Sequence, residues 1–363
     1  MKKIISAILL FGILASLCLF TACSGGGTYE PVESTEEESR VMMRLSLNGE
    51  TYEVKYELYR ALFLNCASDY SDKGEGFFDT DEGKAAAAKI NETVISLITD
   101  IYAALHLARS IGEDPFSKAV DNRILELIAD DVNNDHYGGD YDKYLADLAA
   151  MNMNYAVQEL LLRYQIAYDA VLDHYVGSID VDNPTEDMTE GALEYTKDDV
   201  LSFYNSDECV KVSIITLNGK LPLEDVEKIR NNIASKPTES EALSYAVSCT
   251  LSDPGDIFKG VLIGSESIDY AFFSEVKEAA FALSPNETSK VIKISYGTTP
   301  EYWVLYRTDK TEDYYNECYS DIEDAFVSHK IGMIIASVKE KLSASAEKTE
   351  IFEDIDYSEI KMK

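Results

Sequence analysis

Hydrophobic and polar residues recur with two different periods along this chain, and the change between them separates two regions. From about 84 to 175, hydrophobic residues return every three or four positions, which is the spacing of helices with one buried face. This spacing predicts four helices, over 84–111, 116–131, 140–148 and 155–175. Upstream, Leu45 and Leu47 alternate like a short strand, Asn48-Gly49 is typical of a tight turn, and Thr51 is a candidate N-cap of a following helix. We therefore expect 41–176 to form a helical module with a single strand.

A strand-like pattern begins at 209. Val210–Ile215 and Tyr302–Tyr306 are rich in β-forming residues, with a shorter strand expected over Val291–Ile294. Between them we expect helices, and a loop whose turn is Asp253-Pro254-Gly255; the helices cover 224–233, 240–247 and 272–281, and the loop covers 251–264. With a short helix at 197–204, this order predicts a small α+β domain over 197–310, preceded by a linker over 177–196. A long helix over 311–343 then begins a C-terminal segment of 311–363.

The first residues are typical of a secretory signal. Lys2 and Lys3 precede a nearly continuous hydrophobic run from Ile4 to Phe20, which ends at Thr21-Ala22-Cys23. Cysteine after two small residues resembles the lipobox of bacterial lipoproteins, which implies a signal peptide over 1–22 and lipidation of Cys23. The alternatives are a signal cleaved without lipidation and an uncleaved anchor helix. The following polar residues predict a flexible tether over 23–40, so we expect attachment to the extracytoplasmic face of a cell membrane.

Charge and cysteine content narrow the possible partners. The 363-residue chain carries a formal net charge of −34, and removing 1–22 takes away two lysines and no acid, which leaves −36. Nucleic acid is therefore excluded as a partner, because phosphate binding needs Lys and Arg, whereas cationic polypeptides would be attracted. An extracytoplasmic location permits disulfides, but we expect free thiols at the four remaining cysteines, Cys66, Cys209, Cys249 and Cys318.

Signatures of metal or cofactor chemistry are weak. Asp131, Asn133, Asp135 and Asp142 faintly resemble a calcium-binding loop, but His136 stands where that loop needs glycine. We therefore favour a solvated loop between helices and expect neither a metal nor a cofactor. His106 lies near the buried face of its helix, where a hydrogen-bonded core histidine is the simpler interpretation.

Three segments together resemble the parvulin-type foldase lipoproteins of Gram-positive bacteria (PrsA-like), which are related to SurA-like chaperones. Leu47-Asn48-Gly49-Glu50 resembles the opening of their helical chaperone module. Asp198-Asp199-Val200 and Phe203-Tyr204-Asn205, which lead into Val210–Ile215, resemble the entry to a parvulin domain. Glu278–Leu283 followed by Tyr296-Gly297 resembles its second half. The resemblance implies an α+β fold, with a parvulin-like domain inserted between the helical module and a long C-terminal helix.

The resemblance also marks candidate site residues. Parvulin active sites are built around two histidines on the first and last strands, and the matching residues here are Ser213 and Trp303. Asp253 matches the family's Asp or Cys beside the substrate, so the resemblance makes Asp253 and Ser213 the candidate catalytic residues. Phe272, Val276 and Trp303 are the candidate substrate-binding residues, with core packing as the alternative for Phe272 and Val276.

Without the histidine pair we expect weak prolyl isomerisation or none, and chiefly a chaperone role towards unfolded or newly secreted polypeptides. One alternative is an active peptidyl-prolyl isomerase that uses Asp253. The other alternative is a non-catalytic envelope scaffold or binding lipoprotein.

Overall fold

The computed structural model describes residues 32–67, 70, 73–74, 76–177, 191–268, 274–294, 301–349 and 352. These residues form two compact units. The helical unit comprises 32–177 together with the chain from 335 onward, and the α+β unit comprises 191–334. Each unit is described separately below.

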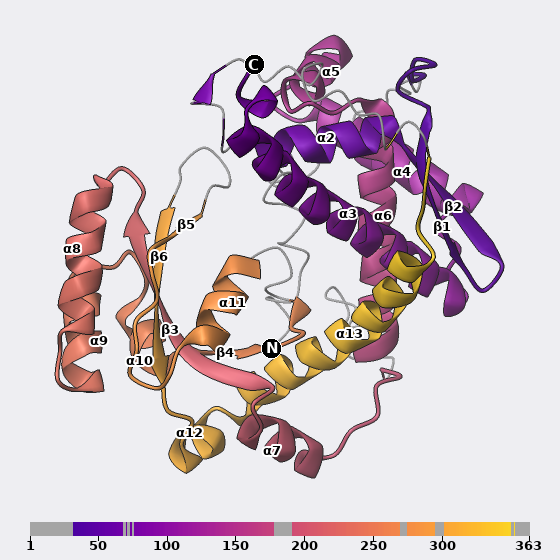
Figure 1. The fold of residues 1–363 in the computed structure, drawn as a ribbon. Coiled ribbons are helices and arrows are strands. Elements are labelled where there is room, and N and C mark those ends of the chain that lie inside the picture. Colours follow the sequence, from indigo (N-terminus) through magenta and orange to yellow (C-terminus); the bar gives the residue numbers. More distant parts are fainter. Residues whose placement is uncertain are drawn as a thin grey trace. The chain divides into compact units, whose positions relative to one another are not determined.

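The helical unit begins with a hairpin of two antiparallel strands, β1 (Val41–Leu47) and β2 (Glu50–Lys55), which Figure 1 shows in indigo. Asn48 and Gly49 form its turn with φ angles of 53° and 85°, a conformation that favours asparagine and glycine. The prediction of a helix starting near Thr51 is wrong, since helix α2 begins only at Tyr56. Strand β7 (Glu347–Lys348) pairs with the other edge of β1 and completes a three-stranded sheet.

Five α-helices and one 3₁₀ turn make up most of the helical unit. They are α2 (Tyr56–Ala67), η2 (Phe77–Asp79), α3 (Asp81–Ser110), α4 (Lys118–Asn133), α5 (Tyr141–Ala150) and α6 (Tyr155–Val176). The four long helices predicted from spacing are thus α3 to α6. Each begins after a side chain that accepts a hydrogen bond from a backbone N–H of the first turn, supplied by Thr80, Ser117, Asp140 and Asn154.

The α+β unit is built on a four-stranded antiparallel sheet of order β4-β3-β6-β5 (Figure 1). Its strands are β3 (Cys209–Asn218), β4 (Val261–Gly264), β5 (Ile292–Ile294) and β6 (Glu301–Thr308). Strands β3 and β6 pair at the centre, with Ser213 opposite Tyr306 and Thr216 opposite Trp303. The two alternating runs therefore lie in one sheet, as their pattern predicts.

The helices of this unit are α7 (Lys197–Asn205), α8 (Leu223–Ala234), α9 (Glu239–Val247), α10 (Pro254–Lys259), α11 (Ser274–Ala282), α12 (Glu312–Glu317) and α13 (Tyr319–Ala344). Two predictions are wrong here. The segment 251–264 holds helix α10 and strand β4 instead of a loop, and the long C-terminal helix is interrupted at Cys318. Helix α13 begins in the α+β unit and ends in the helical unit.

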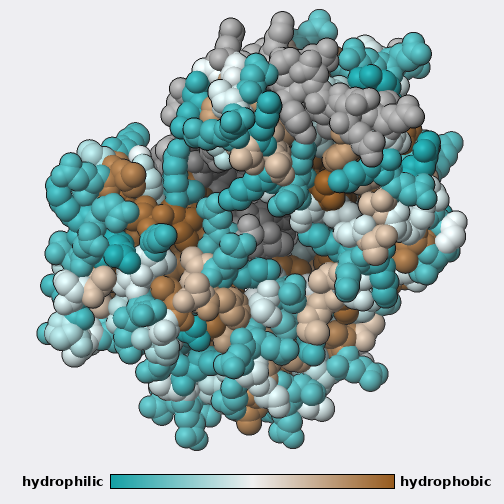
Figure 2. All heavy atoms as spheres, viewed as in Figure 1, coloured by the Kyte–Doolittle hydropathy of each residue, from teal (hydrophilic) through white to brown (hydrophobic). Residues whose placement is uncertain are grey.

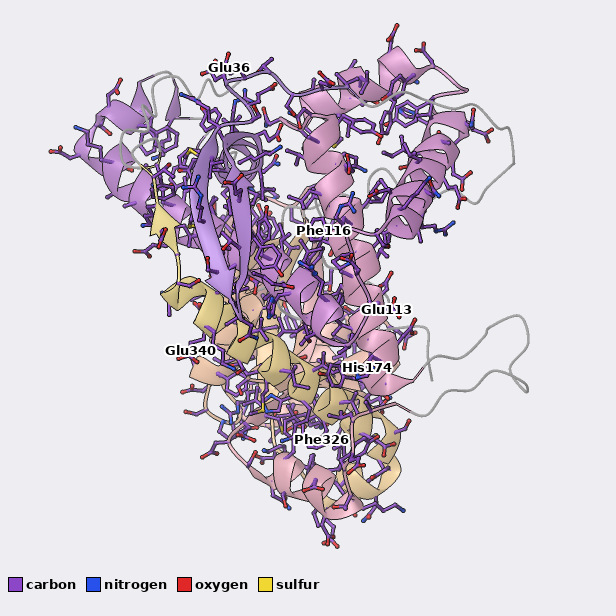
Figure 3. All side chains as sticks on the ribbon, turned by 90° about the vertical axis from the view of Figure 1, so that its right-hand side faces the viewer. Glu36, Glu113, Phe116, His174, Phe326 and Glu340 are labelled. Atoms are coloured by element: carbon purple, nitrogen blue, oxygen red, sulfur yellow. The ribbon has the colours of Figure 1, made fainter. Side chains whose placement is uncertain are left out.

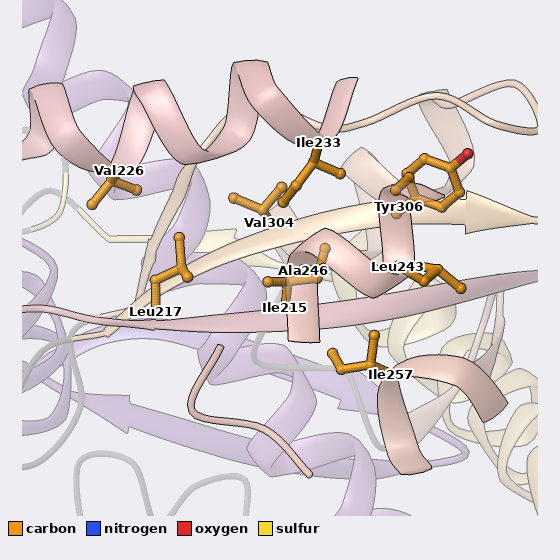
Figure 4. Packing of buried hydrophobic residues seen from close by; sticks show 10 residues of the cluster. Ile215, Leu217, Val226, Ile233, Leu243, Ala246, Ile257, Val304 and Tyr306 are labelled. Carbon is orange, nitrogen blue, oxygen red and sulfur yellow. The ribbon is translucent and has the colours of Figure 1, made fainter. Parts of the chain in front are cut away.

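The two faces of the four-stranded sheet are covered by separate hydrophobic cores. Helices α8, α9 and α10 pack on one face around Ile215, Leu217 and Val304 (Figure 4). Helix α11 packs on the other face, where Val276 and Ala280 belong to one hydrophobic core with residues of all four strands. We call these the α8–α10 face and the α11 face. Together the elements confirm the predicted fold class, α+β with a mainly helical part.

Candidate substrate-binding site of the α+β unit

Ser213 lies in the middle of β3 and is fully buried. Its hydroxyl donates a hydrogen bond of 2.7 Å to the backbone carbonyl of Ile257 in helix α10. A buried hydroxyl must keep such a partner, since an unpaired polar group inside a protein costs about 1–3 kcal/mol. The Ser213 side chain thus joins α10 to the sheet, and its proton faces the helix.

Asp253 is exposed at the start of the same helix. Its Oδ1 accepts a hydrogen bond of 2.7 Å from the backbone N–H of Gly255, and Pro254 occupies the first helical position. This is the ordinary arrangement of an N-cap, which satisfies a backbone donor that the helix itself leaves unpaired. Helix α10 buries Ile257 in the core of the α8–α10 face, so Asp253 and Ser213 belong to this side of the sheet.

Val276 and Trp303 belong to the opposite face. Val276 is fully buried in the core under α11, which supports the packing interpretation of this residue. Trp303 is partly exposed at the margin of the same core, and its ring nitrogen donates a hydrogen bond of 3.0 Å to Oε2 of Glu301. Phe272 lies outside the described residues, as does Cys23.

Strand geometry explains why these residues do not converge. Successive side chains of a strand point to opposite faces of a sheet. Ser213 points to the α8–α10 face, whereas its neighbour Ile214 packs against the core of the α11 face that Trp303 also contacts. Ile214 therefore shares a face of the sheet with Trp303, as does Thr216, which pairs directly with Trp303, whereas Ser213 lies on the other face. The alternation along both central strands is the sequence signal that separates Ser213 from Trp303.

The α11 face carries an apolar margin around Trp303. Hydrophobic side chains that are only partly buried border the core there, namely Ile214, Val261, Ala279, Phe281, Leu283 and Trp303. Two charged side chains adjoin this margin: Glu301 accepts the hydrogen bond of the Trp303 ring nitrogen, and the Arg307 guanidinium donates to the backbone carbonyl of Leu283. Chemically, such a margin can exclude water from an apolar segment.

The histidine of the α+β unit, His329, has a structural role. His329, on α13, is 1% exposed and stacks on Phe203 with ring centroids 5.0 Å apart. Its Nδ1 accepts a hydrogen bond of 3.2 Å from the backbone N–H of Glu266. Burial lowers the pKa of His329, and the neighbouring Glu208 carboxylate opposes this shift. The ring therefore fastens α13 to the turn after β4.

His106 in the helical unit has the hydrogen bonds expected of a core histidine. It is 5% exposed, its Nδ1 lies 3.0 Å from the hydroxyl of Tyr52, and its Nε2 lies 3.4 Å from the Asn48 amide. The Tyr52 hydroxyl donates in turn to Oε2 of Glu50 at 2.6 Å, and Arg109 pairs with the other oxygen of Glu50 at 3.2 Å. This network holds the β1–β2 hairpin against the end of α3.

The loop after α4 is closed by its own side chains. Asn134 Oδ1 accepts hydrogen bonds from the backbone N–H groups of His136 and Tyr137, at 2.9 and 3.1 Å, and Lys143 donates to the carbonyl of His136. Burial, with the charge of Asp130, raises the pKa of Asp131 to about 7. Within the described ranges, no cluster of three His, Cys, Asp or Glu side chains is suited to hold a metal ion.

The four cysteines of the described part of the chain, Cys66, Cys209, Cys249 and Cys318, are all free thiols. Cys209 alone among them is buried, and burial raises the pKa of its thiol. Among the helices that the structure describes, none combines the length and hydrophobicity needed to span a bilayer.

No protein-family model matches the chain, and no curated protein matches it. Among solved structures, the chain is similar to foldase protein PrsA from Streptococcus pneumoniae, with 18% identity and a TM-score of 0.31 over 77% of this chain and 95% of that one. PrsA from Lactococcus lactis matches with 17% identity and a TM-score of 0.23 over 89% and 99%. PrsA from Bacillus subtilis matches with 15% identity and a TM-score of 0.23 over 77% and 95%. All three are PrsA foldases, the family that the sequence motifs resemble, and at these TM-scores the similarity assigns no role to any residue.

Proposed function

We propose that this chain is a lipid-anchored extracytoplasmic chaperone for newly secreted polypeptides. In this proposal Cys23 carries the lipid, 23–40 is the tether, and 197–310 is a parvulin-like domain that binds apolar segments with little or no isomerase activity. The anchor is supported by the hydrophobic run that ends at Thr21-Ala22-Cys23. The binding role is supported by the partly exposed hydrophobic side chains at the margin of the α11 face.

One observation carries the weak-isomerase part of the proposal: Ser213 and Asp253 lie on the α8–α10 side, whereas Trp303 lies on the α11 face. Prolyl isomerisation crosses a barrier of about 18–20 kcal/mol without breaking a covalent bond. Desolvation of the prolyl ring can lower this barrier in part, and placed hydrogen-bond donors lower it further. The apolar margin of the α11 face fits the first contribution, whereas the candidate hydrogen-bonding residues Ser213 and Asp253 lie on the other side of the sheet.

The experiment compares aggregation suppression and prolyl isomerisation by the purified full chain. The test variant is Ile214→Thr/Leu283→Thr, which makes the margin of the α11 face more polar. The control is Leu223→Thr/Leu251→Thr, which removes two exposed hydrophobic side chains of the same unit, 54% and 61% exposed. We expect the unchanged protein to suppress aggregation of an unfolded client while isomerising a proline peptide slowly.

The variants then locate the binding site. We expect Ile214→Thr/Leu283→Thr to require several-fold more protein for the same suppression, and the control to behave as the unchanged protein does. An isomerase rate equal to that of a histidine-bearing parvulin would favour the enzyme alternative. A protein that suppresses no aggregation would favour the scaffold alternative.

A further inference from the structure

Two groups of aromatic rings in contact lie along α7, α12 and the first half of α13. The rings of Tyr204 and Tyr315 have centroids 5.3 Å apart, and those of Tyr315 and Tyr319 are 5.7 Å apart. Tyr195, just before α7, packs edge-on against Phe326 at 5.3 Å; Figure 3 labels Phe326 on α13. Tyr195 remains 38% exposed and Tyr315 and Tyr319 are partly exposed, so these rings are accessible. We call Tyr195, Tyr315 and Tyr319 the tyrosine surface.

Carboxylates are placed between these rings. The Tyr319 hydroxyl donates to Oε1 of Glu323 at 3.4 Å, and the negative charge of Glu323 also acts on Tyr195. Burial and then negative charge raise the pKa of all three tyrosines; the charge is that of Glu323 for Tyr195 and Tyr319, and of Asp198 followed by Glu323 for Tyr315. Glu323 thus lies at the centre of the tyrosine surface, and Asp198 lies at its edge.

The surrounding charge is strongly one-sided. Helix α7 has two acids and one lysine, α12 has three acids, and the segment 319–326 has three more. Some of these acids have local partners, since Asp199 caps α7 and Asp321 pairs with Lys259 at 2.7 Å. Figure 2 shows hydrophilic residues over most of the face in view, with hydrophobic residues in separate patches. The excess of acids gives these helices a negative potential, which attracts an approaching cation.

The chain's own lysines show which group fits the rings. Lys197 places its ammonium 5.6 Å from the centre of the Tyr319 ring, and Lys330 places its own 5.5 Å from that of Phe326. A cation over an aromatic face is attracted to the electrons of the ring, and a nearby carboxylate adds to this attraction. Arginine benefits most, because its planar guanidinium stacks on a ring while it hydrogen-bonds to a carboxylate.

We propose that the tyrosine surface, with Glu323 and Asp198, binds extended arginine- or lysine-rich segments of unfolded client polypeptides. This inference rests on the proposed chaperone function and adds a client class to it. The segment would be held by charge and ring stacking, so its binding would weaken as salt rises. Apolar segments would bind at the α11 face instead, and the two surfaces would recognise different parts of one client.

The test measures binding of three fluorescent peptides of equal length to the purified full chain, by anisotropy. One peptide alternates Arg with Gly and Ser, the second replaces Arg by Glu, and the third replaces Arg by Gln. The test variant is Tyr319→Leu/Glu323→Gln, which removes one ring and one charge. The control is Tyr245→Leu/Glu241→Gln on α9, because Tyr245 also has a lysine over its ring, Lys236 at 4.9 Å.

We expect the Arg peptide to bind the unchanged protein tightest, and the test variant to weaken this binding by about tenfold. The control has the same change in charge and should leave the affinity unchanged within about twofold. Tyr319→Phe keeps the ring and should retain most of the affinity. The fluorescence of Trp303, the single tryptophan of the chain, shows whether each variant is folded.

Three results would overturn the proposal: equal loss in test and control variants, equal binding of the Arg and Gln peptides, or no effect of salt. Failure of the chaperone function is distinguishable from these. A protein that suppresses no aggregation yet binds the Arg peptide through Tyr319 and Glu323 would refute the proposed function and support this surface. Intact aggregation suppression with unchanged peptide affinity in the test variant would do the reverse.

Discussion

Gly332 offers the sharpest test of how α13 is held in the α+β unit. A Cβ atom added at Gly332 would lie 1.6 Å from the carbonyl oxygen of Glu266, whereas ordinary contacts begin near 3.4 Å. Gly332→Ala therefore forces the helix and the turn after β4 apart by about 1.8 Å, the difference between these two distances. The clashing atom belongs to the backbone of Glu266, so rotation of a side chain cannot relieve the clash.

The stability lost in Gly332→Ala can be estimated from the hydrogen bonds between α13 and the turn after β4. Separation breaks the hydrogen bond of 3.2 Å from the Glu266 N–H to His329 and the buried one of 2.8 Å between Ser267 and Ser328. Unpairing these groups costs about 1–3 kcal/mol each, and alanine returns only about 1 kcal/mol of helix propensity. We expect Gly332→Ala to lower the free energy of unfolding by about 2–4 kcal/mol.

Urea unfolding followed by Trp303 fluorescence measures this quantity, because Trp303 lies in the sheet of the same unit. With an m value of about 2 kcal/mol/M, the midpoint should fall by roughly 1–2 M at unchanged m. The control is Met333→Ala, the adjacent position, which is 41% exposed and should cost less than about 0.5 kcal/mol. A midpoint for Gly332→Ala that equals or exceeds that of the unchanged protein would show that α13 does not pack closely against this turn.

Four further predictions concern the site, the core, pH and the anchor. In a protease-coupled peptide assay, the Ile214→His/Trp303→His variant should isomerise proline peptides faster than the Ser213→His/Trp303→His variant, because only the first pair of histidines shares a face of the sheet. Equal rates of the two variants would contradict this. His106→Ala should lower the free energy of unfolding, measured by thermal circular dichroism, by about 2–3 kcal/mol, whereas His136→Ala, with a side chain 56% exposed, should cost under about 0.5 kcal/mol; similar losses would refute the core network. Asp131 has a folded pKa of about 7, above its ordinary 3.8, so its burial opposes folding increasingly as pH rises from about 4 to 7. Asp131→Asn should accordingly stabilise the protein by about 1–2 kcal/mol at pH 8 and have no effect below pH 4, and a gain at both pH values would refute this origin. Cys23→Ala should abolish labelling by a fatty-acid probe, and equal labelling of both proteins would exclude Cys23 as the lipid site.

The sequence predicted most elements wherever the periodicity was long. Helix α6 was recognisable because its buried stripe runs through several turns, from Val157 to Val171. Strand β2 was missed because it reads as the start of a helix: Thr51 is a good N-cap, and Val54 and Leu58 are four residues apart. Its partner β1 decides the outcome by pairing with it across the Asn48-Gly49 turn, and this interaction is invisible to local propensity.

Short elements between turns were the other failure. Strand β4 has only four residues, and the preceding Asp253-Pro254-Gly255 is typical of a turn, although here it begins helix α10. Aspartate followed by proline serves equally well as a helix start, because proline at the first position loses no hydrogen bond that the helix would make. What decides between them is burial of Ile257 against the sheet, which depends on residues more than 40 positions away.

The candidate site depends on which face of the sheet each residue of β3 points to. The resemblance matched Ser213 and Trp303 to the two histidine positions, but a shift of one residue moves a side chain through the sheet to its other face. Ser213 makes the hydrogen bond that holds α10, whereas Ile214 and Thr216 lie on the same face as Trp303, with Thr216 directly opposite it. A segment bound beside Ile214 and Trp303 would meet apolar surface and no imidazole from β3 or β6, which favours holding the segment over isomerising it. The paired histidine variants decide this directly, since they differ only in which face of β3 receives the new imidazole.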